Sequence, residues 1–194
     1  MIRLFDVFDK GNFHLASAIG FFHMCMELFN VNEHSCPKCG AKHPGWRRHG
    51  KYERNLIGFE AGKVVTHLIT VIRYRCMSCK STHAILPASI IPYGSYSLLF
   101  IITVLKEHYG GSLTVAQLCR KYHISPSTLY EWKALYRKHK KMWLGLLKDA
   151  DIPPLKFLEG FFDGSRLRRL QEFFDIARVS FLQDRRQTAQ LAPG

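Results

Sequence analysis

The sequence has no long run of apolar residues. The longest mostly apolar run, residues 98–105, is far shorter than the roughly 20 residues that a membrane-spanning helix needs. The amino-terminal region also lacks the pattern of a secretory signal, because Asp6, Asp9 and Lys10 interrupt its apolar residues. We therefore expect neither secretion nor insertion into a membrane.

Acidic residues are scarce, with 15 Asp and Glu against 28 Lys and Arg, for a formal net charge of +13. The excess is concentrated in the middle of the chain: residues 36–80 carry ten basic and two acidic side chains, and residues 81–143 carry eight and two. A polyanionic partner explains this concentration better than an evenly solvated surface does. DNA is the first candidate and RNA stays open. An anionic membrane is a weaker candidate, since no basic amphipathic helix with a large apolar face is evident.

Common catalytic motifs are also missing. We find no paired-histidine nickase motif, no phosphate-cradling glycine loop and no convincing Ser/His/Asp set. A nuclease core of the ribonuclease-H type needs acidic residues from distant strands of a full α/β domain. The carboxylates of residues 144–194 are instead scattered among eight basic residues: Asp149, Asp151, Glu159, Asp163, Glu172, Asp175 and Asp184. We therefore predict a binding protein and not an enzyme.

Four of the six cysteines form two Cys-x-x-Cys hooks, Cys36 with Cys39 and Cys76 with Cys79. Two such hooks supply the four thiolates of a tetrahedral structural zinc site. Between them, residues 46–57 and 63–75 read as strands around a turn at residues 58–62, and a hairpin there would bring the hooks together. The pattern predicts a zinc ribbon over residues 34–83, with Zn²⁺ bound by these four cysteines.

Other roles for the cysteines are weaker alternatives. They could be buried thiols or a disulfide set, and histidine could enter the ligand set from His34, His43, His49 or His83. Cys25 and Cys119 stand alone in apolar contexts. Unpaired thiols persist in a reducing compartment, so we expect a cytoplasmic protein.

The insert between the hooks is basic, with aromatic residues interleaved. Strand alternation places several of its charges on one face, which can grip phosphates. The candidate DNA contacts in the ribbon are Arg47, Arg48, Lys51, Arg54, Arg73 and Arg75.

Residues 114–133 carry the second strong pattern. Residues 114–122 read as a short helix capped by Thr114, and a second helix begins with Ser125 as its cap and Pro126 at its first position. Apolar residues recur at the spacing that packs two helices together, which predicts a helix-turn-helix, although an αα-hairpin without nucleic acid is the alternative. His123 stands where the turn often has glycine.

The first turns of the second helix of such a motif reach base edges. The candidate DNA contacts there are Ser125, Ser127, Thr128, Tyr130, Glu131, Lys133, Arg137 and Lys138. Leu129, Trp132 and Leu135 are expected in the core.

The predicted fold class is α+β: a small β zinc ribbon joined to a mainly helical region, with packing helices at both ends. Residues 1–33 hold a helix over residues 13–29, which either covers the other elements or forms a homodimer contact. The ribbon spans residues 34–83, a connector residues 84–97, the helix-turn-helix region residues 98–143, and a helical tail for packing or partner binding residues 144–194.

Several runs resemble a known family. They are RYRCMSCKSTH at residues 73–83, LP at 86–87, PYGSYS at 92–97 and ISPSTLYEW at 124–132. They resemble the zinc-ribbon and helix-turn-helix segment of insertion-sequence transposases of the ISL-three type, and still more a family of short, uncharacterised bacterial proteins that accompany transposases. The resemblance covers roughly residues 34–143 and implies binding to element ends.

Three functions therefore compete. The leading hypothesis is a sequence-specific DNA-binding module with structural zinc that works with a separately encoded transposase. The second is a DNA-binding transcription regulator unrelated to transposition. The third, an enzyme that cuts or joins DNA strands, has the least support.

Overall fold

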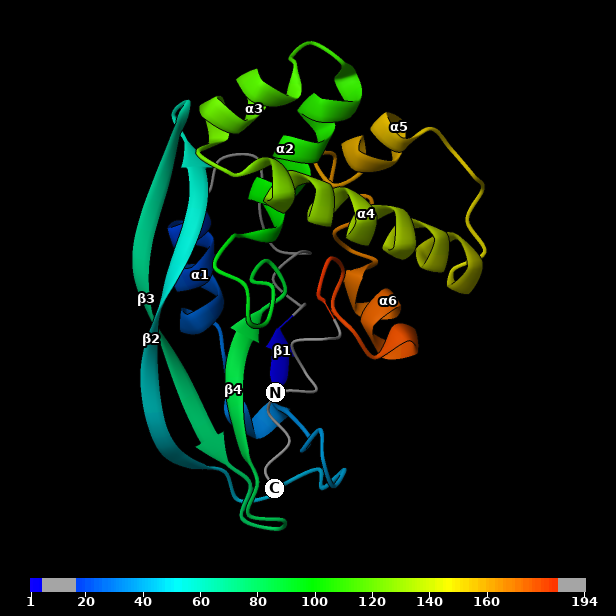
Figure 1. Ribbon diagram of the computed structural model, residues 1–194. Helices are drawn as coiled ribbons and strands as arrows, with labels where there is room; N and C mark the ends of the chain where they lie inside the picture. Colours follow the sequence, from blue (N-terminus) through cyan, green and yellow to red (C-terminus); the bar gives the residue numbers. More distant parts are fainter. Residues whose placement is uncertain (5–16, 185–194) are drawn as a thin grey trace.

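The computed structural model describes residues 1–4 and 17–184, and it has the predicted α+β class. The described strands form one sheet in the order β1-β4-β3-β2, and the helices pack beside it (Figure 1). The strands are β1 Ile2–Leu4, β2 Arg47–Glu60, β3 Lys63–Arg75 and β4 Thr82–Pro87. The helices are α1 Ala18–Glu27, α2 Leu98–Gly110, α3 Val115–Tyr122, α4 Pro126–Leu146, α5 Pro154–Glu159 and α6 Leu170–Ala177.

A long antiparallel hairpin of β2 and β3 dominates the sheet. Its strands are longer than predicted and its turn is shorter, because the turn consists only of Ala61 and Gly62, both at positive φ (47° and 78°). Two central residues at positive φ give the turn whose twist matches the strands. The sequence prediction assigned Gly58 to the turn, but Gly58 lies within β2. A Cβ atom there would lie 3.0 Å from the Cβ of Ala18, so this glycine permits the close approach of α1.

The helix α1 packs on the hairpin. The prediction placed a helix over residues 13–29, whereas the helix begins at Ala18 with Ser17 as its cap, and residues 5–16 lie outside the described residues. Phe22 joins a core cluster with Leu56, Ile69 and Val71 of the hairpin. The described part of this helix therefore covers one face of the hairpin.

Residues 84–97 contain structure that the sequence did not reveal. The strand β4 begins at Thr82 and pairs antiparallel with the end of β3 and parallel with β1. Neither β4 nor β1 was predicted, because a strand of three to six residues with a terminal proline leaves almost no period to read. Every residue from 85 to 92 is buried, so this segment is part of the core that joins the ribbon to the helices.

The helices α3 and α4 form the predicted helix-turn-helix. Thr114 caps α3 in a capping box with Gln117, and the Ser125 hydroxyl caps α4 by accepting the Thr128 amide at 3.1 Å. His123 adopts the left-handed conformation at φ 51°, which histidine tolerates better than branched residues do. Leu129 is fully buried between the helices, whereas Leu135 is half-buried. The helix α4 continues to Leu146, beyond the predicted motif.

The described part of the C-terminal segment shares its core with α4. The ring of Trp143 in α4 stacks on Phe173 of α6, with 5.3 Å between centroids, and meets Phe157, Phe161 and Phe181 nearly edge-on or tilted. All five side chains are buried. Aromatic packing of this kind stabilises beyond the burial of area alone, so α5 and α6 brace α4.

Asp149 links α4 to the same segment. It accepts hydrogen bonds from Trp143 Nε1 at 2.8 Å, from Arg166 at 3.2 Å and from Arg169. Burial raises the pKa of Asp149, but the hydrogen bonds from Arg169 and Trp143 outweigh that effect, and the net pKa lies below its usual value. The carboxylate is therefore charged and holds the end of α4 against the tail.

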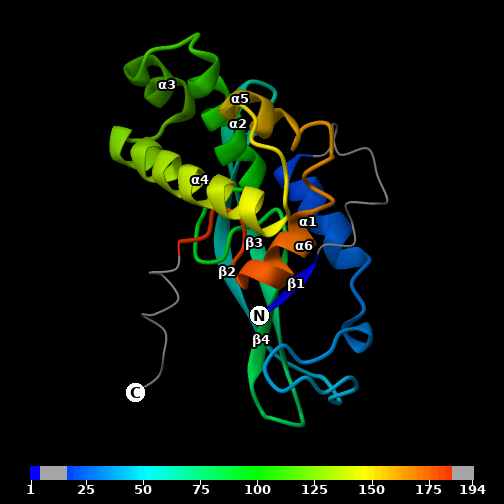
Figure 2. The same ribbon diagram turned by 90° about the vertical axis from the view of Figure 1, so that its right-hand side faces the viewer.

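The elements lie at different ends and sides of the molecule. Figure 1 shows α3 near the tip of the hairpin, where the rings of Phe59 and Tyr122 are 4.9 Å apart, while the cysteine loops lie at the opposite end. Figure 2 shows α1 on one side and α3 with the start of α4 on the other. Within the described residues, we find no helix with the length and apolar character needed to cross a bilayer.

Candidate metal centre and nucleic-acid interface

The two cysteine hooks meet as predicted. The Sγ atoms of Cys36 and Cys79 are 3.7 Å apart, those of Cys39 and Cys76 are 3.8 Å apart, and all four lie within 4.8 Å of one another. Metal–sulfur bonds of about 2.3 Å in a tetrahedron give sulfur–sulfur separations of about 3.8 Å. The cluster could therefore hold a metal ion. All four cysteines are free thiols, so the disulfide alternative is wrong for this structure.

The backbone gives both hooks the same shape. The Cys36 amide donates to the Ala41 carbonyl at 2.9 Å, and the Cys76 amide donates to the Ser81 carbonyl at 2.9 Å. A backbone hydrogen bond also joins the second hook to the loop that follows the first, since the Met77 amide donates to the Pro44 carbonyl at 3.0 Å. This bond between residues distant in sequence had no signal in the pattern of residues.

The residue after the second cysteine of each hook is left-handed. It is Gly40 at φ 75° in the first hook and Lys80 at φ 62° in the second. Glycine adopts this conformation without cost, whereas lysine needs support from its surroundings. The Arg75 guanidinium supplies it by donating to the Lys80 carbonyl at 3.1 Å.

The pKa values of two thiols in the cluster are shifted in opposite directions. Hydrogen bonds from the Ser81 side chain and backbone lower the pKa of Cys79 to about 6. A hydrogen bond from the Ala41 backbone lowers the pKa of Cys39, but burial and hydrogen bonds with the other three thiols prevail and raise it to about 11. Four thiolates this close require a cation between them.

His83 of β4 lies beside the cluster, outside the ligand set. Its Nε2 is 3.4 Å from the Sγ of Cys36, and its ring meets Trp46 edge-on with 5.6 Å between centroids. Burial lowers the pKa of His83 to about 4, so the ring is neutral. A neutral ring with hydrogen on Nε2 can donate to the Cys36 thiolate, as partners of metal ligands commonly do.

Four arginines of the ribbon gather at the end of the hairpin that carries the cysteine cluster. Arg47 lies directly opposite Arg75 in the β2–β3 register, and Arg73 lies two residues before Arg75 on β3. All three are exposed, as is Arg48. Like charges that face each other across strands are destabilising, so a polyanion bound here would relieve their repulsion.

Two predicted contacts in the middle of β2 differ in their surroundings. Lys51 is exposed. Arg54 is half-buried, and its guanidinium donates to the Ile91 carbonyl at 3.4 Å, near the limit for a hydrogen bond. Burial lowers the pKa of Arg54. The structure thus turns Arg54 toward the protein interior and leaves Lys51 toward solvent.

The predicted contacts on α4 lie mostly on one exposed stripe. Ser127, Tyr130, Glu131, Arg137 and Lys138 are exposed, and Lys133 and Thr128 are half-exposed. The Ser125 hydroxyl is 2.8 Å from that of Ser127 and 2.9 Å from that of Thr128. The Lys133 ammonium lies 5.0 Å from the centre of the Tyr130 ring, a cation–π contact that orders both side chains.

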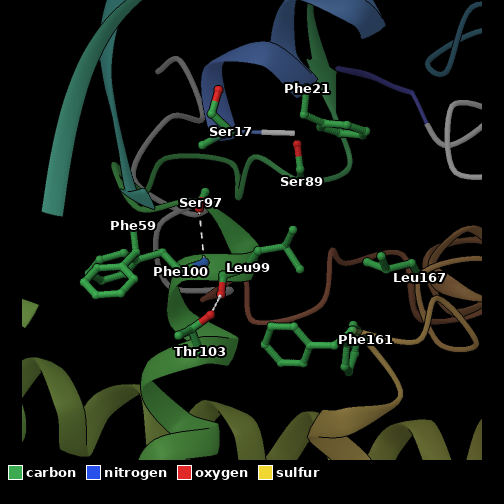
Figure 3. A pocket seen from close by; sticks show the side chains of 12 residues that line it. Ser17, Phe21, Phe59, Ser89, Ser97, Leu99, Phe100, Thr103, Phe161 and Leu167 are labelled. Atoms are coloured by element: carbon green, nitrogen blue, oxygen red, sulfur yellow. Dashed lines mark hydrogen bonds between the residues drawn. The ribbon is translucent and has the colours of Figure 1, made fainter. Parts of the chain in front are cut away.

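A cavity of about 230 Å³ lies away from these surfaces, between α1, α2 and the C-terminal segment (Figure 3). Five of its twelve lining residues are phenylalanines, among them Phe21, Phe59 and Phe161. The hydroxyls of Ser97 and Thr103 are already bonded at the start of α2, to the Phe100 amide and the Leu99 carbonyl.

Among the described residues, only the four cysteines form a cluster of three or more potential metal-ligating side chains.

A family model described as a domain of unknown function, DUF6431, matches residues 36–132, which is 97 of the 194 residues. The chain belongs to the DUF6431 family. The DUF6431 match starts at Cys36, the first cysteine of the cluster, and ends at Trp132 in α4, so it contains both hooks and the turn of the helix-turn-helix. No curated protein and no solved structure matches the chain.

Proposed function

We propose that this DUF6431 protein binds double-stranded DNA sequence-specifically, with the helix-turn-helix as the reading element and the metal-bound ribbon as a second grip. The observation that carries the proposal is α4: its cap and core residues fix the helix on α3, while Ser127, Tyr130 and Glu131 in its first turns stay exposed. Exposed polar side chains on a firmly packed helix are what major-groove reading requires.

Zinc is the metal that the donor set favours. Four sulfur ligands would fill all four positions of a tetrahedron, which is typical of structural zinc, and would leave no open position for a substrate. In this proposal the ion supplies folding free energy to the loops that carry the ligands.

The two surfaces have different tasks. The first turns of α4 carry hydroxyl, phenol and carboxylate groups that distinguish base edges, followed by the cations Arg137 and Lys138. The ribbon presents Arg47, Arg48 and Arg75 at the far end of the hairpin. Guanidinium groups on a strand contact phosphates irrespective of sequence, so the ribbon would add affinity and the helix specificity.

The sequence resemblance to transposase segments favours one biological setting. In that setting the protein recognises the ends of a mobile element, and a separately encoded transposase cuts the DNA. The arrangement predicts a neighbouring reading frame with a nuclease domain and a complex of the two proteins on element-end DNA. Recovery of regulated promoters in place of element ends, by sequencing DNA bound in cells, would favour a transcription regulator.

The experiment starts with selection of bound fragments from a random duplex library by the zinc-loaded chain. Binding of the selected duplex and of a scrambled duplex is then measured by fluorescence anisotropy over a range of salt. Failure to enrich any DNA, or equal binding of all sequences, contradicts the proposal. Tighter binding of single-stranded RNA than of any duplex would assign the basic surface to RNA.

Substitution of Tyr130 tests the reading helix. Tyr130 is 52% exposed and outside the core, so Tyr130→Ala is expected to fold normally. Loss of a base contact should weaken binding to the selected duplex by about 1–3 kcal/mol and leave the scrambled duplex unaffected. An equal loss on both duplexes would show that α4 does not read bases.

Substitution of Arg47 and Arg48 to Ala tests the ribbon. Loss of two phosphate contacts should weaken binding to both duplexes alike and reduce the slope of log affinity against log salt by about 2. The matched control is Lys148→Ala with Lys156→Ala, which removes two exposed cations from the C-terminal segment. If the control lowers the slope as much, the effect is one of net charge and the ribbon is not a contact surface.

A further inference from the structure

The hairpin has two free edges with opposite character. The order β1-β4-β3-β2 leaves β2 as an edge strand, and its Arg47–Leu56 part has no other strand beside it among the described residues. This edge carries Arg47, Arg48, Lys51, Glu53 and Arg54. Charged side chains on an edge prevent it from pairing with the edge of another chain.

The second free edge belongs to β3. β4 pairs with β3 only at Arg73–Arg75, so among the described residues the segment Lys63–Ile72 pairs on one side alone, with β2. β2 and β3 cross in Figure 1, and the half of this segment nearer the tip of the hairpin lies at the outer margin of the molecule. Residues 64–72 contain no Lys, Arg, Asp, Glu or Pro, and six of the nine are Val, Ile or Leu. No residue type that normally protects an edge is present in it.

One apolar side chain on this strand is unusually exposed. Leu68, near the midpoint of the segment, is 64% exposed, more than any other large apolar residue described. Thr66 and Thr70 flank it on the same face and are also exposed. An apolar, β-branched edge that can still form a full row of backbone hydrogen bonds is a pairing surface.

We propose that two copies of this chain pair through β3, edge to edge and antiparallel, about a two-fold axis near His67 and Leu68. The distribution of charge on the chain indicates that the partner at this edge is a second copy. Two copies of a chain with a net charge of +13 repel over most of their surface, whereas residues 64–72 can face themselves without placing like charges together. The pairing extends the hairpin into a four-stranded sheet across the dimer and relates the two α4 helices by the same axis.

The test is sedimentation equilibrium of the zinc-loaded full chain. The wild type should show twice the chain mass of 22.4 kDa and dissociate on dilution. Leu68→Lys should raise the dimer dissociation constant about tenfold, because it places two lysines next to the axis. The wild-type amides of residues 63–72 should also exchange hydrogen more slowly at high than at low protein concentration.

The matched control is Leu28→Lys, which adds the same charge at a leucine that is 55% exposed and caps the C-terminal end of α1, away from β3 in the sequence. It should leave the dissociation constant unchanged. Circular dichroism and zinc content verify that both variants are folded. A wild type that stays monomeric overturns the proposal, as does a dimer insensitive to Leu68→Lys or equally weakened by Leu28→Lys. A monomer that pairs this edge only with another protein would also overturn it. None of these outcomes depends on DNA binding.

Discussion

Loss of the metal should unfold one end of this protein and leave the other end folded. Among residues 28–50, only Cys36 and Pro44 are buried, so the first hook and its flanks have almost no apolar core. Ordering a residue costs about 1–2 kcal/mol, or on the order of 20 kcal/mol for the loop that carries the first hook. Burial of two side chains returns only about 4 kcal/mol. A structural zinc ion contributes about 10–16 kcal/mol, which is the scale required.

Cys76→Ser removes one ligand and tests this reasoning. Cys76 is completely buried, and the weaker oxygen ligand should lower zinc affinity strongly. Hydrogen exchange should become fast at both hooks, as it should in the wild type treated with a chelator, while α2 and α4 keep their protection. Cys119→Ser is the control, because Cys119 lies between α3 and its neighbours, far from the cluster. Full protection of the hooks in metal-free protein, or one tightly bound zinc in Cys76→Ser, would refute the reasoning.

Two further predictions concern stability. Asp149→Asn should cost about 1–3 kcal/mol at neutral pH in chemical denaturation, because half-buried Arg166 loses its carboxylate partner and half-buried Arg169 keeps only Glu172. The pKa of Asp149 is lowered in the folded state, so this contribution is present above its ordinary pKa and is lost as pH falls through the lowered value; a gap that persists in strong acid would contradict the assignment. Gly58→Ala should cost about 1 kcal/mol, since the new Cβ meets Ala18, whereas Gly50→Ala on the same strand has open space and should be neutral or slightly stabilising. Equal effects of the two glycine substitutions would show that α1 does not press on the hairpin.

The elements that the sequence predicted well are those whose signal is local. The four-cysteine cluster follows from two short spacings, and the caps Thr114 and Ser125 follow from the hydrogen bonds that helix starts require. The same residues that define these signals make the contacts. A sequence alone was therefore sufficient to expect the cysteine cluster and the helix-turn-helix.

The elements that were missed depend on contacts between distant parts of the chain. β1 is three residues long and exists because β4 offers it an edge, and Gly58 is a strand residue because α1 lies against it. Arg54 looked like its exposed neighbours, yet the fold turns it toward Ile91. Backbone pairing and packing, not residue type, decide these cases.

By itself, the sequence determined the four-cysteine cluster, the basic middle of the chain and the paired helices, because each rests on residue chemistry at fixed short spacing. Only the tertiary structure decided that Arg47 faces Arg75, that β2 has a charged free edge and β3 an uncharged one, and that the tail braces α4 through Trp143. These relations come from strand register and from side chains packed across large separations in sequence, which no local pattern records.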